Sequence, residues 1–577
     1  MVGVGPGHLP RRFGALAGLA AAAVALGAAE VVAVLTGARS APLVAVGGVL
    51  VDLAPAPLKQ FAVDVFYVYD KIALLVGTAV LLAGFAALVG LVAVRSLPLG
   101  YAGIALFGAV GVLAALTRPG AGPVAALPSL LGAVLAAGVL RLFVAGPPGR
   151  ALTAAGPPGR TLTAAGPPGR TLTAATPAAD RTGPGAAAPP ALGGRADPGP
   201  PAGPAGGTEG TPLPPSVSAY PDEYARRRFL TGVGLAVGAA AVGGFGGRWL
   251  STRRGVSAAR AAIELPAPTS PAVPVPADAD LRVPGLSSYV TPNRDFYRID
   301  TALVVPRVDP AQWRLRIHGR VRNPITLRYA DLLARPMIER HITLACVSNE
   351  VGGDLIGNAR WLGVPLGPLL AEAGPLPGAD QVVGRSADGW TCGSPTGLLT
   401  DGRDAMLAVG MNGEPLPIEH GFPVRVVVPG LYGYVSACKW LVELELTSFA
   451  DFDAYWVPRG WSAQGPIKTQ SRIDTPRRGR TLSTGPVTVA GVAWAQHVGI
   501  RQVEVRVDDG DWQPATLAAT VSTDTWTQWS WRWLATPGEH TLRVRATDAT
   551  GAVQTGESRP VDPDGATGWH TITVTVT

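Results

Sequence analysis

Hydrophobic residues are concentrated in the first quarter of this 577-residue chain. Four long apolar stretches, each with at most one charged residue, occur there at residues 13–37, 72–94, 99–116 and 124–144. Each is close to the length of about 20 apolar residues that a helix needs to cross a bilayer. We therefore expect residues 1–145 to form an all-α transmembrane region with about four spans.

Between the first two stretches, residues 41–69 are apolar but interrupted by charges and prolines such as Asp52 and Pro57. We predict an interfacial or re-entrant segment there. Basic residues precede the first span, at residues 11–12, and end the fourth, at Arg141, so the positive-inside rule places both ends in the cytoplasm. A cleaved signal peptide is the alternative for the first stretch, but the further spans favour an anchor.

The chain then loses its hydrophobic periodicity. Residues 146–224 are mostly Pro, Gly and Ala and repeat the decapeptide Ala-Gly-Pro-Pro-Gly-Arg-(Ala/Thr)-Leu-Thr-Ala, which predicts a disordered linker. Residues 225–250 place Arg-Arg-Arg-Phe-Leu before an apolar stretch; this is either a fifth span or a segment resembling a twin-arginine export signal. Both alternatives place the rest of the chain outside, beginning with a Pro/Ala-rich tether at residues 251–280.

Residues 281–455 alternate between strand and helix patterns. Strand-like runs occur at residues 313–319, 424–428 and 441–446. Amphipathic helical runs occur at residues 329–333 and 366–373. This mixture predicts a compact α+β domain.

Residues 456–577 show short strands separated by turn signals. The strand-like runs lie at residues 487–494, 502–507, 529–534, 540–546 and 570–576. Their close spacing predicts an all-β, immunoglobulin-like sandwich.

Charge and cysteine content exclude several functions. The net charge of +7 comes partly from arginines scattered in loops and the linker, without basic residues interleaved with aromatics, so we expect no nucleic-acid binding. Three cysteines match no zinc or iron–sulfur spacing, although a disulfide between Cys392 and Cys438 is possible. Because no Cys-x-x-Cys-His motif occurs and only His8 precedes His318, we expect no haem, and electrons then need a separate carrier.

The third cysteine, Cys346, is the strongest candidate for chemistry. It follows an apolar, β-rich run that includes Ile342 and Leu344, and it begins a polar loop that contains glycines. A strand end presents such a side chain to a cavity, where a thiolate can act as a soft metal ligand or a nucleophile. The alternative is a buried cysteine that serves only as a small apolar residue.

Five ordered motifs surround this cysteine and extend downstream. They are Cys346-Val-Ser-Asn, Arg360-Trp-Leu-Gly-Val-Pro-Leu, Met411-Asn-Gly-Glu-Pro-Leu-Pro, His420-Gly-Phe-Pro-Val-Arg425-Val-Val-Val-Pro-Gly and Lys439-Trp-Leu. With these motifs, residues 281–577 resemble the sulfite oxidase family of molybdopterin enzymes. The resemblance implies a molybdenum–molybdopterin cofactor with Cys346 as the only protein ligand of the metal. It also implies that the C-terminal sandwich is a dimerisation domain, so we expect a homodimer.

The same resemblance assigns roles to further residues. Those expected to hold the pterin are Asn293, Tyr297, Arg298, Thr391, His420, Arg425, Ser436, Ala437 and Lys439. Arg425 suits a phosphate because its planar fork binds bidentately, and Lys439 offers a point charge. Arg298 falls on the arginine that faces the substrate anion in sulfite oxidases; the alternative is a surface arginine paired with Asp295 or Asp300.

One position departs from the family. Trp390 stands where sulfite oxidases carry an active-site tyrosine, and an indole cannot relay a proton as a phenol can.

We expect a membrane-anchored oxidoreductase, facing outward from the cell membrane, that transfers oxygen to or from a small sulfur oxyanion. The alternatives are a methionine or protein sulfoxide reductase and, from another class, a non-catalytic scaffold with a vestigial pterin pocket.

Overall fold

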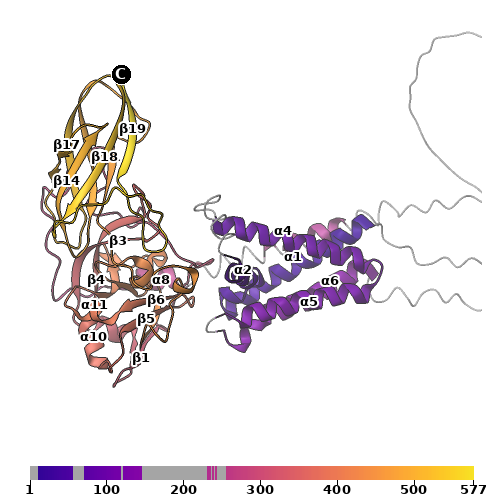
Figure 1. Ribbon diagram of the computed structural model, residues 1–577. Coiled ribbons are helices and arrows are strands. Elements are labelled where there is room, and N and C mark those ends of the chain that lie inside the picture. Colours follow the sequence, from indigo (N-terminus) through magenta and orange to yellow (C-terminus); the bar gives the residue numbers. More distant parts are fainter. Residues whose placement is uncertain are drawn as a thin grey trace, which may run out of the picture. The chain divides into compact units, whose positions relative to one another are not determined.

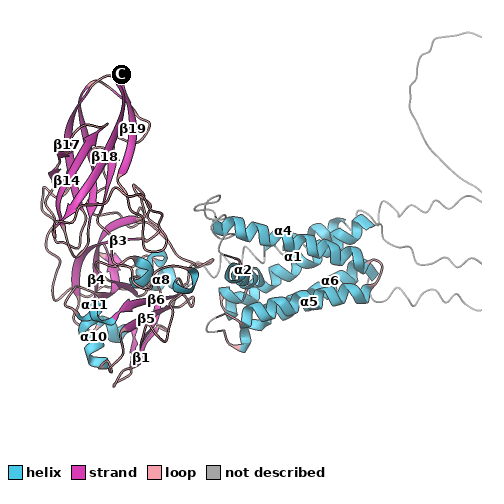
Figure 2. Cartoon of the chain, in the orientation of Figure 1, coloured by secondary structure: helices cyan, strands magenta, loops and turns pink. Residues whose placement is uncertain are grey.

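The computed structural model describes residues 11–55, 70–118, 121–145, 230–235, 237–239, 241–242 and 255–577. They form a group of helices, a mixed α+β domain and a β-sandwich, the fold class expected from the sequence (Figures 1 and 2). The predicted linker, the arginines of the twin-arginine-like segment, most of the predicted fifth span and residues 56–69 lie outside the described residues.

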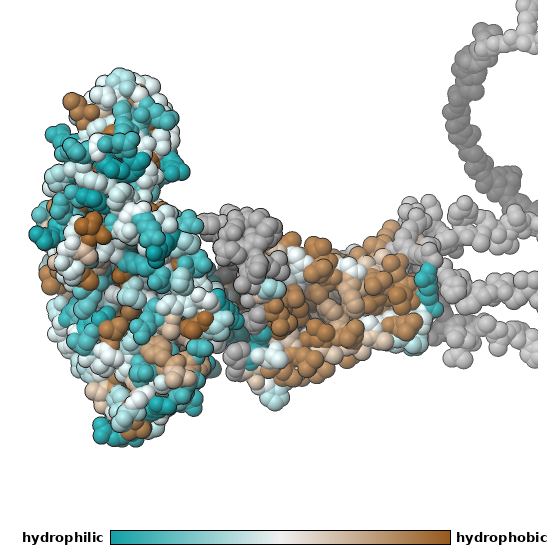
Figure 3. Space-filling model, in the orientation of Figure 1, coloured by the Kyte–Doolittle hydropathy of each residue, from teal (hydrophilic) through white to brown (hydrophobic). Residues whose placement is uncertain are grey.

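Among the described residues, four helices are long and apolar enough to span a bilayer. They are α1 (Arg11–Thr36), α4 (Asp70–Ala93), α5 (Leu97–Leu116) and α6 (Leu127–Ala145). Each coincides with one of the four predicted spans. Figure 3 shows that the visible face of the helical part is mostly apolar, as expected of a surface that faces lipid. The segment predicted as interfacial or re-entrant begins with α2 (Pro42–Leu53), whose 12 residues are too few to cross a bilayer.

Helices α1 and α4 approach each other through glycines. A methyl group on Gly18 would lie 2.0 Å from the carbonyl oxygen of Ala86, and one on Gly90 would lie 2.1 Å from that of Gly14. Small residues at such contacts let helix backbones pack directly against each other in a membrane. Glycine at these positions therefore sets the distance between the two helices.

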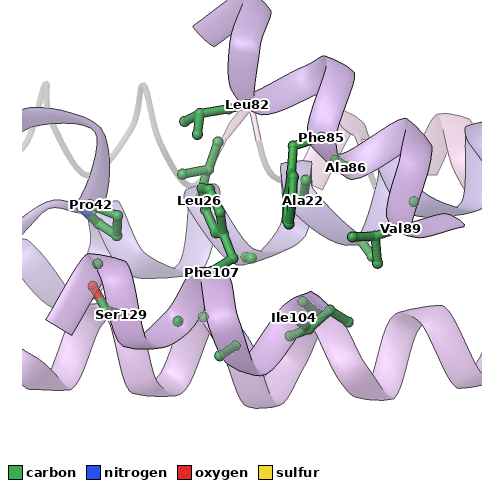
Figure 4. Close-up of a pocket in the computed structure, with 18 of the residues that line it drawn as sticks. Ala22, Leu26, Pro42, Leu82, Phe85, Ala86, Val89, Ile104, Phe107 and Ser129 are labelled. Carbon is green, nitrogen blue, oxygen red and sulfur yellow. The ribbon is translucent and has the colours of Figure 1, made fainter. Parts of the chain in front are cut away.

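A small apolar cavity of about 80 Å³ lies among α1, α4, α5 and α6 (Figure 4). Phe85 and Phe107 stack beside it with ring centroids 5.6 Å apart, and Leu26 also lines it. Ser129 is a polar residue of the lining. Its lining is almost entirely apolar.

The α+β domain contains two sheets. The first has the order β2-β1-β10-β5-β6, formed by Ile325–Arg328, Arg314–Gly319, Leu441–Thr447, Gln381–Ser386 and Thr391–Pro395. The second has the order β3-β4-β7-β8 with β9 beside β7, formed by Ile338–Ala345, Ile356–Pro365, Met406–Met411, Glu414–Pro415 and Arg425–Val427. Short helices complete the domain: α9 (Tyr329–Leu333), α10 (Leu366–Ala373), α11 (Thr396–Thr400) and α12 (Gly433–Ser436).

The stretch expected to be a tether packs against this domain. It begins with α8 (Val256–Ala261), where Arg260 donates to the carbonyl oxygen of Leu416 at 2.8 Å. Further on, the backbone N–H of Thr269 donates to the Met337 carbonyl at 2.8 Å. The packed structure thus begins near residue 256, earlier than the boundary at residue 281 expected from the sequence, because main-chain hydrogen bonds need no hydrophobic periodicity.

The sandwich consists of one four-stranded and one five-stranded sheet. The first has the order β11-β13-β17-β16, formed by Gln470–Thr475, Gly485–Trp494, Thr527–Ala535 and Thr516–Leu517. The second has the order β12-β19-β18-β14-β15, formed by Thr481–Leu482, His570–Val576, Gly538–Asp548, Ile500–Val507 and Gln513–Pro514. Trp529 is fully buried between valines of both sheets. Trp526 belongs instead to the core of the α+β domain and donates to the Tyr289 carbonyl at 2.9 Å, which joins the two domains.

Candidate active site

Cys346 lies directly after strand β3, where the sequence places it. Residues 341–345 of the strand are buried, so the chain leaves the sheet with its register fixed, and the Cys346 N–H donates to the Leu355 carbonyl at 2.9 Å. Burial raises the pKa of the Cys346 thiol. The N–H groups of Val347 and Ser348, the Ser348 hydroxyl and the charge of Lys439 act in the opposite direction, because each favours a thiolate. These donors and this cation suit a thiolate that holds a metal.

Arg425, the first residue of β9, is a buried cation. Its side chain is 5% exposed, stacks over the Trp361 ring at 5.0 Å and donates from Nη1 to the His420 carbonyl at 3.2 Å. Burial lowers its pKa to about 10. Among the described residues no carboxylate pairs with this guanidinium, and a buried charge without a counter-charge is costly. The site therefore has the charge that an anionic group, such as a phosphate, would compensate.

His420 is held as a neutral histidine. Burial and the nearby Arg425 lower its pKa to about 4. Its Nε2 lies 3.0 Å from the Asn293 carbonyl oxygen, which can only accept, so Nε2 carries the proton and Nδ1 is left as an acceptor. The Asn293 side chain is fixed in turn by the Asn412 amide, which donates to its Oδ1 at 2.8 Å.

Lys439 and Arg298 share one carboxylate. Lys439 Nζ lies 2.9 Å and Arg298 Nε 2.8 Å from the same oxygen, Oδ2 of Asp300. The Asp300 side chain is 4% exposed, whereas that of Arg298 is 38% exposed. Burial lowers the pKa of Lys439 to about 8, and Asp300 acts against that shift. Arg298 thus pairs with Asp300, as one of the two interpretations of the sequence expected, but Asp300 is buried and serves a second cation.

Tyr297 connects the cysteine to the arginine. Burial raises its pKa, and the charges of both Cys346 and Arg425 act on it. Its ring stacks on Phe296 with centroids 5.2 Å apart. These interactions connect seven residues, which we call the Cys346 cluster. Its members are Tyr297, Arg298, Asp300, Cys346, His420, Arg425 and Lys439.

Ser436 and Ala437 lie just before Lys439, at the end of α12. The Ser436 hydroxyl donates to the Tyr432 carbonyl at 3.0 Å, and the Ala437 N–H donates to the Gly433 carbonyl at 2.9 Å. Both groups are thus used within their own turn. Burial raises the pKa of Tyr432, on which the charge of Cys346 also acts.

Trp390 and Thr391 are not tied to the Cys346 cluster by the contacts of the described residues. The Trp390 N–H donates to Asp388 Oδ1 at 3.0 Å, and the Thr391 hydroxyl accepts from the Tyr455 N–H at 3.0 Å. Their β5–β6 turn does lie beside the cluster, because the Ala387 N–H donates to the Trp440 carbonyl at 2.7 Å.

Sequence reasoning did not assign Asp300 to the site. The only local signal was its position two residues after Arg298. Cys392 and Cys438, for which a disulfide is possible from the sequence, are free and buried. Burial and the neighbouring Cys392 raise the pKa of the Cys438 thiol.

Comparison with known proteins finds family matches in both domains. Residues 302–456 match the family described as "Oxidoreductase molybdopterin binding domain", and residues 470–544 match "Bacterial Ig domain". The chain is 33% identical over 185 residues to the uncharacterized oxidoreductase YuiH of Bacillus subtilis (strain 168), covering 31% of this chain and 89% of YuiH. The chain belongs to the sulfite oxidase family of molybdopterin oxidoreductases.

Other members of the sulfite oxidase family are matched over shorter shares of their length. Human mitochondrial sulfite oxidase is 31% identical over 290 residues, which cover 42% of this chain and 52% of that protein. The chain thus spans about half the length of this relative. The structure of the sulfane dehydrogenase SoxCD from Paracoccus pantotrophus is 26% identical, with a TM-score of 0.43, and the match covers 49% of this chain and 81% of that one.

The residues present fit the family's cofactor. Cys346 offers a soft ligand for molybdenum, and the buried guanidinium of Arg425 lacks the counter-charge that a pterin phosphate would supply. Neutral His420 offers a hydrogen-bond acceptor at Nδ1. The Cys346 cluster therefore has the donor set that a molybdopterin site requires.

Proposed function

We propose that this protein is a membrane-anchored, molybdopterin-dependent oxidoreductase that transfers an oxygen atom between water and a small sulfur oxyanion, as sulfite oxidases do. The observation that carries the proposal is the buried Arg425, which has no carboxylate partner among the described residues and shares a cluster with the Cys346 thiol. A metal-binding thiolate and an anion-binding guanidinium in one cluster are what a molybdenum centre with a phosphate-bearing ligand needs.

Each residue of the site has a proposed role. Cys346 holds the molybdenum, and Arg298 orients the substrate anion. The pterin is held by Asn293, Tyr297, Arg298, Thr391, His420, Arg425, Ser436, Ala437 and Lys439. When bound, the cofactor supplies a centre that accepts two electrons. In the oxidase direction, the sulfur substrate would gain one oxygen atom from water and lose two electrons, and the water would release two protons. Trp390 lines the substrate side in this proposal.

The surroundings of the site complete the proposal. The four apolar helices anchor the chain in the cell membrane. A fifth crossing by residues 225–250, as the sequence predicts, makes the number of crossings odd and places the catalytic domain on the outer side. A separate electron carrier takes the electrons. The sandwich mediates homodimerisation, as the family resemblance implies.

Turnover of sulfite tests this proposal. The full-length protein, purified from a host that makes the cofactor, is expected to reduce an artificial electron acceptor when sulfite is added. Cys346→Ser should lower this turnover at least about 100-fold, because hydroxyl is a poor replacement for a soft thiolate ligand. Cys392→Ser is the matched control, since Cys392 is also buried but is not part of the cluster. Equal turnover in all three proteins would refute the assignment of Cys346.

A sulfoxide reductase is the second candidate, and two observations favour it. By the family resemblance, Trp390 stands where sulfite oxidases carry a tyrosine that can relay a proton, and Asp300 neutralises part of the charge that Arg298 would offer to an anion. A neutral sulfoxide would fit such a site better than a dianion. Oxidation of a reduced dye by methionine sulfoxide, without any turnover of sulfite, would support this candidate over the first. Protein that binds no molybdenum would instead indicate the non-catalytic scaffold.

A further inference from the structure

A second cavity of about 280 Å³, lined by both polar and apolar residues, lies where the sandwich meets the α+β domain. Strand β3, the chain before the α+β domain and the loop between β16 and β17 line it, with Ser270, Arg340, His341, Asp404, Ser522 and Asp524 among the lining residues. None of these residues belongs to the Cys346 cluster.

His341 is the unusual group in this cavity. Its side chain is 6% exposed, and its Nδ1 is buried without a hydrogen-bond partner. Among the described residues, no hydrogen bond to its Nε2 is present either. Burial lowers the pKa of His341, so the ring is neutral near pH 7 and one of its nitrogens is an acceptor. Nδ1 has almost no accessible surface, whereas Nε2 is not enclosed in this way, so Nε2 is the ring nitrogen that a ligand in the cavity can reach.

The charged residues that line the cavity carry a net negative charge. Arg340 is fully engaged, since Nε donates to Asp404 at 2.8 Å and Nη1 and Nη2 donate to the carbonyl and hydroxyl of Ser270 at 3.1 and 3.0 Å. Asp524 uses its Oδ1 in a 3.1 Å contact with His497 Nδ1, and this contact does not involve its other carboxylate oxygen. One arginine against two carboxylates leaves a net negative charge on the lining. Burial raises the pKa of Asp524, and the nearby Asp404 adds to that shift.

The spacing of the acceptors favours an organic cation over a metal ion. Ligands of one metal ion lie close together, and among the described residues only His318, Glu443 and Glu445 bring three such atoms within 4.8 Å of one another. The acceptors of His341, Asp404 and Asp524 are spread more widely. The cavity volume also exceeds the about 10–15 Å³ that one water needs, so a polyatomic ligand fits.

We propose that this cavity is a binding site for a small organic cation with a guanidinium or primary ammonium group. Its N–H groups donate to the free carboxylate oxygens of Asp524 and Asp404 and to the His341 ring. The positive charge balances the second carboxylate. The site lies outside the catalytic machinery and is independent of whether molybdenum is bound.

Calorimetric titration of the full-length protein with methylguanidinium tests this proposal, with methylurea as a neutral probe of nearly the same shape. Wild-type protein is expected to bind methylguanidinium at least about tenfold more tightly than methylurea. Asp524→Asn, which keeps the shape of the side chain, should weaken binding of the cation about tenfold. His341→Phe should also weaken it. Asp509→Asn serves as the control, because the Asp509 side chain is 99% exposed on the sandwich.

Four results would overturn the proposal. The first is no heat of binding with methylguanidinium up to about 20 mM, where even weak ligands register. The second is equal binding of methylurea, and the third is equal binding by Asp524→Asn and Asp509→Asn. Stabilisation by Mn²⁺ or Zn²⁺ in place of methylguanidinium would also overturn it, since the site would then take a metal ion.

Discussion

At the residue scale, the site is defined by how three cations are compensated. Arg298 and Lys439 share the buried carboxylate of Asp300, whereas Arg425 has no acid partner among the described residues. The cluster without a ligand is therefore charged at Arg425 and partly neutralised at Arg298. An anion is expected to bind most strongly where the charge is unpaired, and the Asp300 carboxylate competes with any anion that approaches Arg298.

Asp300→Asn tests that competition. The substitution frees Arg298 and adds one positive charge to the site, so the KM for sulfite should fall about fivefold, which corresponds to about 1 kcal/mol. The same variant should be less stable by about 1–3 kcal/mol, because Lys439 loses its buried partner. Steady-state kinetics and thermal unfolding measure the two effects. Asp295→Asn is the control, since Asp295 is exposed and pairs with the exposed Arg294. A raised KM would mean that Asp300 orients Arg298 instead of competing for it.

His570 should make stability depend on pH. Burial, with Arg472 nearby, lowers its pKa to about 4, and the Ile473 N–H donates to its Nδ1 at 3.0 Å. Between about pH 4 and 6.5 the unfolded chain binds the proton that the folded chain excludes. The free energy of unfolding is therefore not reduced by His570 above pH 6.5. It falls as the pH drops from 6.5 toward 4, by up to about 3 kcal/mol.

Thermal unfolding of wild type and His570→Gln at pH 7 and 4.5 measures this effect. Glutamine can accept the same N–H but does not titrate, so the variant should lose less stability on acidification than wild type. Parallel loss in both proteins would show that other groups cause the acid sensitivity.

The sequence predicted the members of the Cys346 cluster better than their pairing. The family resemblance led us to expect Tyr297, Cys346, His420, Arg425 and Lys439 at the site. Cys346, His420 and Arg425 lie at the ends of regular elements, whereas Tyr297 and Lys439 lie in loops. The shared partner Asp300 was not assigned to the site, because no local pattern links it to a lysine 139 residues away. Likewise, nothing in the sequence indicates the cavity at His341, which depends on a loop from another domain.

At the element scale, local periodicity specified the regular structure closely. The helices expected at residues 329–333 and 366–373 coincide with α9 and α10, because their apolar positions recur at helical spacing. Residues 256–280 were expected to be a tether because they are rich in proline and alanine. They pack on the α+β domain through backbone hydrogen bonds and Arg260, which leave no such signature.

The contact between α1 and α4 gives a prediction at this scale. Gly18→Val should force the helices apart, because its side chain would overlap the Ala86 carbonyl, at a cost of about 1–3 kcal/mol or more. Thermal aggregation of the detergent-solubilised protein measures this loss. Gly77→Val on α4 is the matched control, since a methyl group there meets nothing within 4 Å. Equal effects of the two substitutions would contradict direct packing at Gly18.

At the scale of the whole molecule, the sandwich and the α+β domain share buried contacts. Trp526 and Trp494 of the sandwich belong to the core of the α+β domain. Arg472 of β11 also donates to the Gly353 carbonyl at 2.6 Å, in the loop that follows Cys346. The sandwich therefore supports the loop that bears the proposed metal ligand. Docking of this kind joins residues far apart in the sequence, so the pattern of each domain alone could not predict it.

The content of molybdenum and pterin in the full-length protein tests the central claim most directly. Wild type, purified from a host that makes the cofactor, should carry both. Arg425→Met should carry little pterin and yet be at least as stable as wild type without cofactor, because it removes a buried, unpaired cation. Arg385→Met is the control, since Arg385 is paired with Glu443 and Glu445. Wild-type protein without molybdenum, or Arg425→Met with undiminished pterin, would contradict the proposed site.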